Sequence, residues 1–183
     1  MVDGEKNIIE KAIKGEASAF GLLYDYYQPL IYRFIYLKVS HREEAEDLTH
    51  QVFLNAWQNI EQYAFRGFPF SSWLYRIARN QVIDYYRVKK TNISIETIEI
   101  RIDNTSIKKM DDSLDIERVG KAILQLKPEQ QDVILMRFVE DLSPKEVAMA
   151  INKTSTAVRL IQHRAIKNLK EILKLDRNAT ETQ

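Results

Sequence analysis

One stretch of the chain concentrates the residue types that bind single-stranded nucleic acid: FRGFPFSSWLYRIARNQVIDYYR, from Phe65 to Arg87. Guanidinium groups neutralise phosphates, and flat rings stack on bases. On a helix of about 100° per residue, the stretch divides into two faces. The predicted core face holds Phe70, Leu74, Ile77, Gln81 and Tyr85, and the predicted basic face holds Ser72, Arg76, Arg79, Asn80 and Arg87. A purely structural alternative, with rings in the core and arginines solvated, stays open on this stretch alone.

The start of this predicted helix is well marked. Ser71 is the expected N-cap. The aromatic segment ahead of it is broken by Gly67 and Pro69, so its rings cannot all lie on a regular helix. Asp84 falls close to the predicted core face, where an unpaired carboxylate is costly. We therefore expect Asp84 to hold the helix through a hydrogen bond rather than to contact a base.

An earlier stretch, between residues 40 and 60, predicts a helix with a docking face. Ser40 and Glu43 have the spacing of a capping box, and an apolar stripe follows them. That stripe consists of Leu48, Val52, Ala56 and Ile60, and the opposite side carries Asp47, His50, Gln51 and Gln58 around Leu54. A leucine ringed by hydrogen-bonding side chains is typical of a docking face. An isolated exposed leucine is also ordinary on a solvated surface.

Composition narrows the possible functions. The 183 residues include 27 basic and 26 acidic side chains, a net charge of +1, so the chain alone would bind DNA poorly and depend on a partner. There is no cysteine, His41, His50 and His163 are scattered, and no phosphate-binding GxxxxGK occurs. We expect no enzyme, no metal, no cofactor and no small-molecule substrate. The charged N-terminus and the lack of a long apolar run predict a cytoplasmic protein with no direct membrane insertion.

Two further segments organise the chain. Residues 17–37 have helical apolar spacing, with an expected break at Pro29. Between residues 88 and 112 helical periodicity is lost and acids outnumber bases, which predicts a linker. Isoleucines nearly alternate with polar residues there, as in a half-buried strand: Ile93, Ile95, Ile98, Ile100 and Ile102. Because a lone strand has no partner in this chain, we expect an extended segment lying on another surface.

The strongest local signal lies in the stretch LSPKEVAMAINKTSTAVRLIQHRAIKNLK. Ser143 and Glu146 form a predicted capping box, and Pro144 suits the first helical position. After a short helix, Asn152 tolerates the positive φ that a sharp turn needs, and a second helix begins near Ser155. Two helices joined so tightly predict a helix-turn-helix, whose second helix usually enters the major groove.

The second helix of this motif is predicted to be amphipathic. Its inward set is Val158, Ile161, Ala165, Leu169 and Ile172, and its outward set is Thr156, Arg159, His163 and Lys167. The outward side chains suit base edges and phosphates. A helical hairpin with a merely solvated basic face is the structural alternative.

Together these blocks resemble a bacterial RNA polymerase sigma factor of the extracytoplasmic-function type. AEDLTHQVFLNAW, from Ala45 to Trp57, is similar to the core-binding helix of region 2 in that family. PFSSWLYRIARNQVIDYYR, from residue 69 to 87, is similar to its promoter-melting and minus-10 helix. LKPEQQDVILMRF, followed by the helix-turn-helix, resembles region 4, which reads the minus-35 element. The short linker in place of a third domain is similar to the minimal members of the family.

The resemblance implies roles for particular residues. Polymerase binding, on the clamp helices of the β′ subunit, is implied for Asp47, His50, Gln51, Leu54 and Gln58. Minus-10 DNA binding is implied for Phe65, Arg66, Phe68, Arg76, Arg79, Asn80 and Arg87. Minus-35 DNA binding is implied for Lys153, Ser155, Thr156, Arg159, His163, Arg164 and Lys167. The implied partners are core RNA polymerase, through the clamp helices and the β flap, promoter DNA, and an anti-sigma factor, which is frequent in the family.

Two departures from the family pattern bear on these roles. His50 and Gln51 stand where relatives commonly have a glutamine followed by an acid. Asn152 replaces the usual glycine of the turn.

The sequence therefore predicts an all-α fold with two small helical domains joined by a flexible linker. The predicted ranges are 1–87 for region 2, 88–112 for the linker, 113–175 for region 4 and 176–183 for a disordered tail. The rival interpretation is a stand-alone helix-turn-helix transcriptional regulator, which leaves the arginine-rich block and the face around Leu54 without a role.

Overall fold

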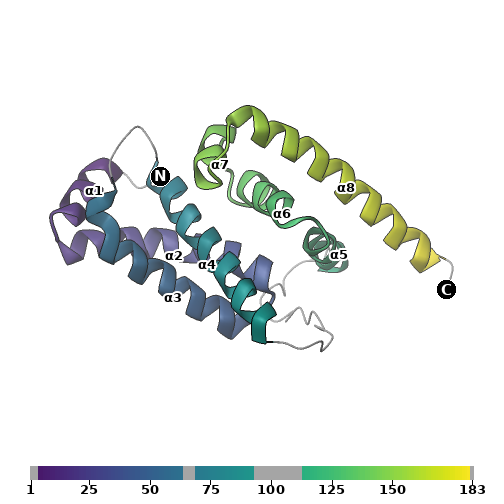
Figure 1. Ribbon diagram of the computed structural model, residues 1–183, viewed down its shortest axis with the longest axis horizontal. Coiled ribbons are helices and arrows are strands. Elements are labelled where there is room, and N and C mark those ends of the chain that lie inside the picture. The colour runs from purple at the N-terminus through teal and green to yellow at the C-terminus, as the bar shows by residue number, and fades with distance from the viewer. Residues whose placement is uncertain (1–3, 64–68, 93–112, 182–183) are drawn as a thin grey trace. The chain divides into compact units, whose positions relative to one another are not determined.

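The computed structural model describes residues 4–63, 69–92 and 113–181. Every regular element in those ranges is a helix, which confirms the all-α prediction. The chain divides into two compact units, Met1–Arg101 and Ile102–Gln183 (Figure 1). The strand-like isoleucines from Ile93 to Ile102 lie outside the described residues.

The described residues of the first unit form four α-helices and one short turn of 3₁₀-helix. They are α1 (Glu5–Ile13), α2 (Ala17–Val39), α3 (Arg42–Asn59), η1 (Ile60–Gln62) and α4 (Phe70–Asn92). Helices α2, α3 and α4 pack on one another, and α1 packs on α2 (Figure 1). The core is rich in aromatic rings: Phe34 and Tyr75 meet edge to face with centroids 5.4 Å apart. Burial of such large apolar surfaces is the main stabilising term for a unit of this size.

Three expectations about helix ends in this unit are wrong. Pro29 does not break α2, because the buried side chains Leu23, Tyr27 and Ile31 continue across it and their packing outweighs one missing backbone hydrogen bond. Ser40 does not cap α3. It has φ 54° and ends α2, with its N–H donating to the Tyr36 carbonyl at 2.8 Å.

The third wrong expectation concerns α4, which begins at Phe70, so Ser71 lies inside the helix rather than capping it. Ser72, placed on the predicted basic face, is only 2% exposed and lies in the interior. At its other end α4 continues to Asn92, so helical structure extends five residues past Arg87.

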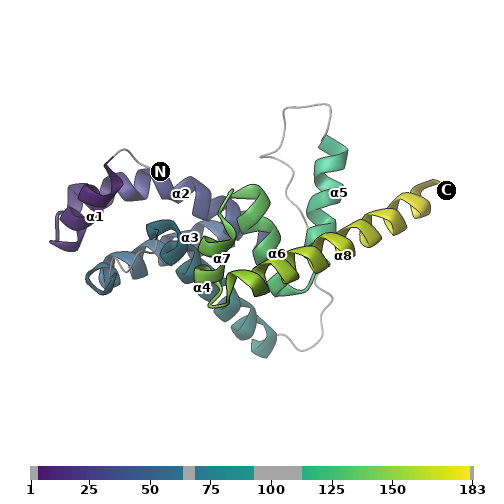
Figure 2. The same ribbon diagram turned by 90° about the horizontal axis from the view of Figure 1, so that it is seen from above.

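The second unit contains α5 (Ser113–Leu124), α6 (Pro128–Ile134), the π-helical turn η3 (Leu135–Val139), α7 (Pro144–Ala150) and α8 (Ser155–Glu181). Helices α5, α6 and α7 all contact α8, which is the longest element of the unit (Figure 2). Its interior is aliphatic and includes Val133, Leu135, Met136, Val147 and Val158. Residues 176–181, predicted as part of a disordered tail, continue α8.

Among the described helices, none has the length and apolarity needed to cross a bilayer.

Candidate nucleic-acid and polymerase interfaces

The helix-turn-helix in the second unit is held by its own backbone and caps. The Ser143 N–H donates to Glu146 Oε2 at 2.7 Å, and the Glu146 N–H donates to Ser143 Oγ at 3.3 Å, so the predicted capping box is confirmed. Asn152 has φ 55° at the turn, as expected. Sequence reasoning missed Thr154, whose Oγ1 accepts the Ala157 N–H at 3.1 Å and caps α8.

A second brace fixes the recognition helix α8 against the turn that precedes α7. The Arg137 guanidinium donates to the Leu142 carbonyl and, through Nε, to Gln162 Oε1 at 3.2 Å. Asn168 Nδ2 donates to Gln130 Oε1 at 3.3 Å further along α8. These bonds tie α8 to η3 and to α6.

The outward side of α8 is polar and cationic, as predicted. Thr156, Arg159, His163, Arg164 and Lys167 are all exposed, whereas Val158 and Ala165 on the opposite side are fully buried. Two other residues implied in minus-35 binding are placed differently. Lys153 Nζ lies 3.0 Å from Glu129 Oε1, and Ser155 is half-buried in the first turn of α8.

Sequence reasoning also missed Leu160, which is 50% exposed on this cationic side. The signal was available, because residue 160 lies about 40° from residue 156 around a helix axis. A face defined by its polar side chains leaves this leucine out.

The basic face of α4 is largely as predicted. Arg76, Asn80 and Arg87 are exposed and Arg79 is half-buried. Asp84 is exposed rather than close to the core, contrary to expectation, and its carboxylate lies 3.0 Å from Arg87 Nη2 on the same helix. An anion therefore sits within the cationic face and offsets part of its charge. Phe65, Arg66 and Phe68 lie outside the described residues.

A cluster of aromatic rings lies beside the residues that come directly before and after that aromatic segment. Tyr63 and Phe70, which flank it, have ring centroids 5.4 Å apart, and Phe70 lies 5.6 Å from Tyr27. The Tyr27 hydroxyl donates to the Glu5 carboxylate of α1. Burial and the nearby Glu5 charge raise the pKa of Tyr63 to about 12. The cluster therefore ties α1, α2 and the start of α4 together.

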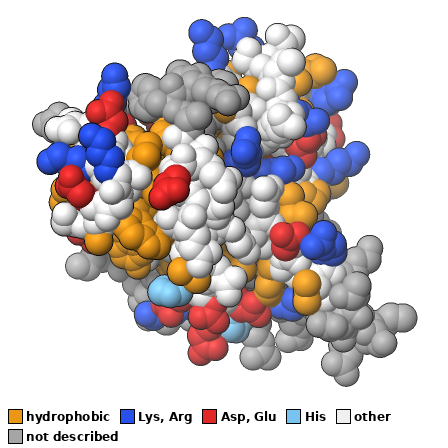
Figure 3. Space-filling view, turned by 60° about the vertical axis from the view of Figure 1, so that its left-hand side comes forward, with side chains coloured by type: hydrophobic (Ala, Val, Ile, Leu, Met, Phe, Trp, Pro, Cys, Tyr) orange, Lys and Arg blue, Asp and Glu red, His pale blue; other side chains and the backbone are white. Residues whose placement is uncertain are grey.

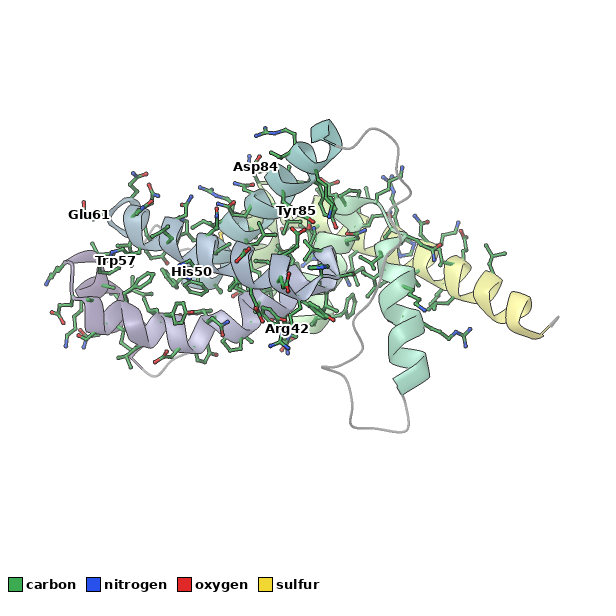
Figure 4. All side chains as sticks on the ribbon, turned by 90° about the horizontal axis from the view of Figure 1, so that it is seen from below. Arg42, His50, Trp57, Glu61, Asp84 and Tyr85 are labelled. Carbon is green, nitrogen blue, oxygen red and sulfur yellow. The ribbon has the colours of Figure 1, made fainter. Side chains whose placement is uncertain are left out.

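The predicted docking face of α3 is exposed. Asp47, His50, Gln51, Leu54 and Gln58 all face solvent, and Leu54 is 51% exposed. The opposite stripe packs inward through Val52, Ala56 and Ile60, while Leu48 is half-buried. Figure 4 shows His50 on α3, between Arg42 and Trp57. In the space-filling view, acidic side chains gather beside histidines on one face of the molecule (Figure 3), and α3 contributes both kinds.

An open groove of about 520 Å³ lies between α3 and α4. Asp47 and Gln51 from the docking face line it, together with Asp84 and Tyr85, which neighbour each other on α4 in Figure 4. Lys89 Nζ donates to the Tyr85 hydroxyl at 2.5 Å, which raises the pKa of Lys89. The docking face is therefore continuous with this groove, whose charged lining residues are Glu44, Asp47, Asp84 and Lys89.

The family of the chain follows from two matches. Sigma-70 region 2 matches residues 23–91, and Sigma-70 region 4 matches residues 122–171. The chain belongs to the sigma-70 family, as an extracytoplasmic-function sigma factor with regions 2 and 4. Members of this class are non-enzymatic transcription initiation factors that direct RNA polymerase to promoters.

Individual relatives agree with this assignment. The chain is 36% identical to the extracytoplasmic-function sigma factor BldN of Streptomyces coelicolor, over 91% of this chain and 64% of BldN. It is 28% identical to SigW of Bacillus subtilis, over 92% of this chain and 96% of SigW. The chain thus spans less than two thirds of BldN and nearly all of SigW. Its fold is similar to that of the sigma factor RpoE, solved with the anti-sigma factor NepR from Bartonella quintana, with a TM-score of 0.69 and 21% identity over 86% of this chain and 98% of RpoE.

Proposed function

We propose that this chain binds core RNA polymerase, brings it to promoters with particular minus-35 and minus-10 elements, and assists in opening the DNA. The supporting observation is that α3 in the first unit and α8 in the second expose faces of distinct chemistry. The α3 face around Leu54 carries one carboxylate, one imidazole and two amides, and the α8 face around Arg159 is cationic. Sigma factors act in the cytoplasm, where we place this chain.

Polymerase binding falls to α3. Asp47, His50, Gln51, Leu54 and Gln58 would contact the clamp helices of the β′ subunit, with Leu54 as the apolar anchor inside a hydrogen-bonding rim. Five exposed side chains on one face support this role, because the other face of the same helix is committed to the core. The β flap is the proposed partner of the second unit.

Recognition and opening of the minus-10 element fall to α4 and the segment ahead of it. Arg76, Arg79, Asn80 and Arg87 would bind the opened strand, and Phe65, Arg66 and Phe68 would hold unstacked bases. Opening DNA costs about 1.4 kcal/mol per base-pair step, which stacking and phosphate contacts to the opened strand offset. Replacing Phe68 should impair opening more than closed-complex binding, and permanganate footprinting separates the two.

Reading of the minus-35 element falls to α8. Thr156, Arg159, His163, Arg164 and Lys167 would enter the major groove, with Lys153 and Ser155 at the helix start near the DNA backbone. Lys153 would exchange its contact with Glu129 for a phosphate. The net charge of only +1 suits this division, because polymerase supplies most of the non-specific attraction for DNA.

An anti-sigma factor is a further proposed partner. The solved RpoE chain with a similar fold is held by one, NepR. A partner of this kind would cover the exposed faces of α3 or α8 and compete with polymerase or DNA.

The test is run-off transcription with bacterial core polymerase on a genomic library. We expect transcripts from a set of promoters that share two spaced elements. Leu54→Glu should abolish them, whereas Leu22→Glu, at a leucine of 54% exposure on α2, should not. Tight binding of the purified chain to duplex DNA, with no transcript in the presence of core polymerase, would instead favour a stand-alone regulator.

A further inference from the structure

Leu160 lies on the recognition helix at a position where burial does not explain the presence of an apolar side chain. It is 50% exposed, although leucine is among the residues most often found inside proteins. Around the axis of α8 it lies about 160° from Val158 and about 140° from Ala165, the two fully buried side chains of that helix. Leu160 therefore points away from the core of its unit.

The neighbours of Leu160 are those of a DNA-reading surface. Thr156 and Arg164 lie one turn before and one turn after it, and His163 lies three residues on. All three are exposed. Few kinds of partner can contact a single apolar side chain at the centre of a face that carries cations and a hydroxyl group. A protein partner with a large apolar patch would also have to accommodate the surrounding cations.

The major groove offers one apolar feature on its base edges, the C5-methyl group of thymine. A duplex with its phosphates flanking that methyl group complements both parts of the face, because the cations meet phosphates and base acceptors while the leucine meets the methyl. No other base presents such a group in the major groove of unmodified DNA.

We propose that Leu160 is a specificity-determining residue that recognises a thymine of the minus-35 element through its methyl group. This inference rests on the proposed function of α8 as the minus-35 reader. It adds a residue outside the polar set assigned from the sequence, and it specifies a base: at the position facing Leu160, thymine is preferred to cytosine and to any base without that methyl.

The other large apolar side chains that are exposed in the described part of this unit lie away from the first turns of α8: Val119, Phe138 and Leu175. Phe138 is 58% exposed but lies in the η3 turn, and Leu175 is 70% exposed about 22 Å further along α8. Leu175 lies about 60° from Leu160 around the helix axis, so it faces a similar direction beyond the first turns of the recognition helix. It is the matched control for the experiment.

The experiment compares thymine with deoxyuridine, which differs in the major groove only by the missing methyl. Promoters recovered from the run-off library are synthesised with deoxyuridine at each thymine of the minus-35 element in turn. Holoenzyme assembled from core polymerase and the full chain is titrated onto each duplex. The proteins compared are the wild type, Leu160→Ala, Leu160→Met and Leu175→Ala.

For the wild type we expect one thymine at which loss of the methyl weakens binding about three- to tenfold, the usual size of one buried methyl contact. Leu160→Ala should weaken binding to the thymine duplex by a similar factor and lose all sensitivity to deoxyuridine at that position. Leu160→Met, which keeps an apolar side chain, should retain most of the sensitivity. Leu175→Ala should match the wild type. Because Leu160 is half exposed, the variants should keep the thermal stability of the wild type, which is checked by circular dichroism.

Two results overturn the inference while leaving the proposed function intact. One is a wild type that selects a minus-35 element but tolerates deoxyuridine at every thymine. The other is Leu160→Ala retaining the wild-type ratio of thymine to deoxyuridine affinity, or losing affinity for core polymerase instead. A wild-type holoenzyme with no minus-35 selectivity at all overturns the proposed function of α8, and the inference with it.

Discussion

Two leucines in this chain have almost the same exposure and opposite surroundings. Leu54 on α3 is 51% exposed among Asp47, Gln51 and Gln58, and Leu160 on α8 is 50% exposed among Arg159 and Arg164. Exposed apolar area alone would predict the same role for both leucines. The charge of the neighbours separates them: a face without Lys or Arg gains no affinity for DNA from phosphate contacts, whereas a cationic face does.

The two units also differ inside. All nine tyrosines and both tryptophans lie in the first 87 residues, so aromatic rings dominate the first core and aliphatic side chains the second. Because of this difference, the two units can be perturbed and observed separately. Tryptophan fluorescence reports only the first, and changes in ring ionisation should act only there.

The largest expected effect is on the affinity for core polymerase, when Leu54 is replaced. Leu54→Glu puts a charge at the centre of the proposed polymerase contact, and we expect roughly a 100-fold loss of affinity for core polymerase, about 3 kcal/mol. Fluorescence anisotropy of the labelled chain with core polymerase measures it. Leu22→Glu is the control, and Leu160→Ala should leave this affinity unchanged. Equal losses for Leu54→Glu and Leu22→Glu would mean that the α3 face is not the anchor.

The next effect concerns the cations around the second leucine. Arg159→Ala should reduce discrimination between the correct and a mutated minus-35 element by about 1–3 kcal/mol, because a base contact is lost. Competition binding of holoenzyme to the two duplexes measures this ratio, with Lys170→Ala as the control for charge. His163→Ala should act in the same direction. Unchanged promoter preference in both variants would remove α8 residues 159 and 163 from base reading.

Alkaline pH should lower the stability of the first unit through its buried tyrosines, which the second unit lacks. The folded unit holds the pKa of Tyr63 near 12, above its ordinary value of about 10, so the unfolded chain loses this proton first. The stabilisation is complete below pH 10 and is lost as the pH rises from about 10 to 12, by roughly 2 kcal/mol. Urea unfolding followed by tryptophan fluorescence should show this loss, and Tyr63→Phe should reduce it. Tyr24→Phe is the control, and an identical pH dependence in both variants would refute the assignment to Tyr63.

A smaller effect should appear in the second unit alone. Ser143→Ala removes the side-chain half of the capping box and should destabilise the helix-turn-helix by about 1 kcal/mol. Circular dichroism of the whole chain should show a lower melting temperature for one transition while tryptophan fluorescence is unchanged. Ser18→Ala, at an exposed serine of α2, is the control. A shift in the fluorescence transition would show that the units do not unfold separately.

The smallest effect tests the anion within the α4 face. Asp84→Asn removes the ion pair between Asp84 and Arg87, an exposed pair worth at most about 1 kcal/mol. We expect up to a severalfold gain in holoenzyme affinity for a minus-10 single strand at low salt, diminishing as salt screens the charges. Glu61→Gln, at an exposed acid outside α4, is the control. Weaker binding by Asp84→Asn would mean that the aspartate positions Arg87 for DNA.

Helical periodicity and local capping signals predicted much of the fold. The capping box at Ser143, the positive φ of Asn152 and the start of α8 were predictable because each depends on residues within one turn. The outward faces of α3 and α8 followed from the apolar stripes opposite them. Family resemblance then supplied roles that spacing alone could not.

Other features depended on contacts between distant segments. Pro29 stays inside α2 because the α2 core face is packed on both sides of it, and Ser72 is buried because α4 is packed along a stripe that includes Tyr75 and Ala78. Asp84 pairs with Arg87 at the surface, on the side that this rotation of α4 leaves exposed.

The sequence by itself determined that the chain is helical, where the helix-turn-helix lies, and which polar residues face outward in it, because local periodicity and capping decide these. Only the tertiary structure decided how each helix is rotated about its axis within its unit, since that depends on the packing of side chains far apart in sequence. Packing of Val158 and Ala165 into the core of the second unit leaves Leu160 half exposed, beside the cations that helical spacing already places next to it, and this makes the leucine a candidate reader of DNA.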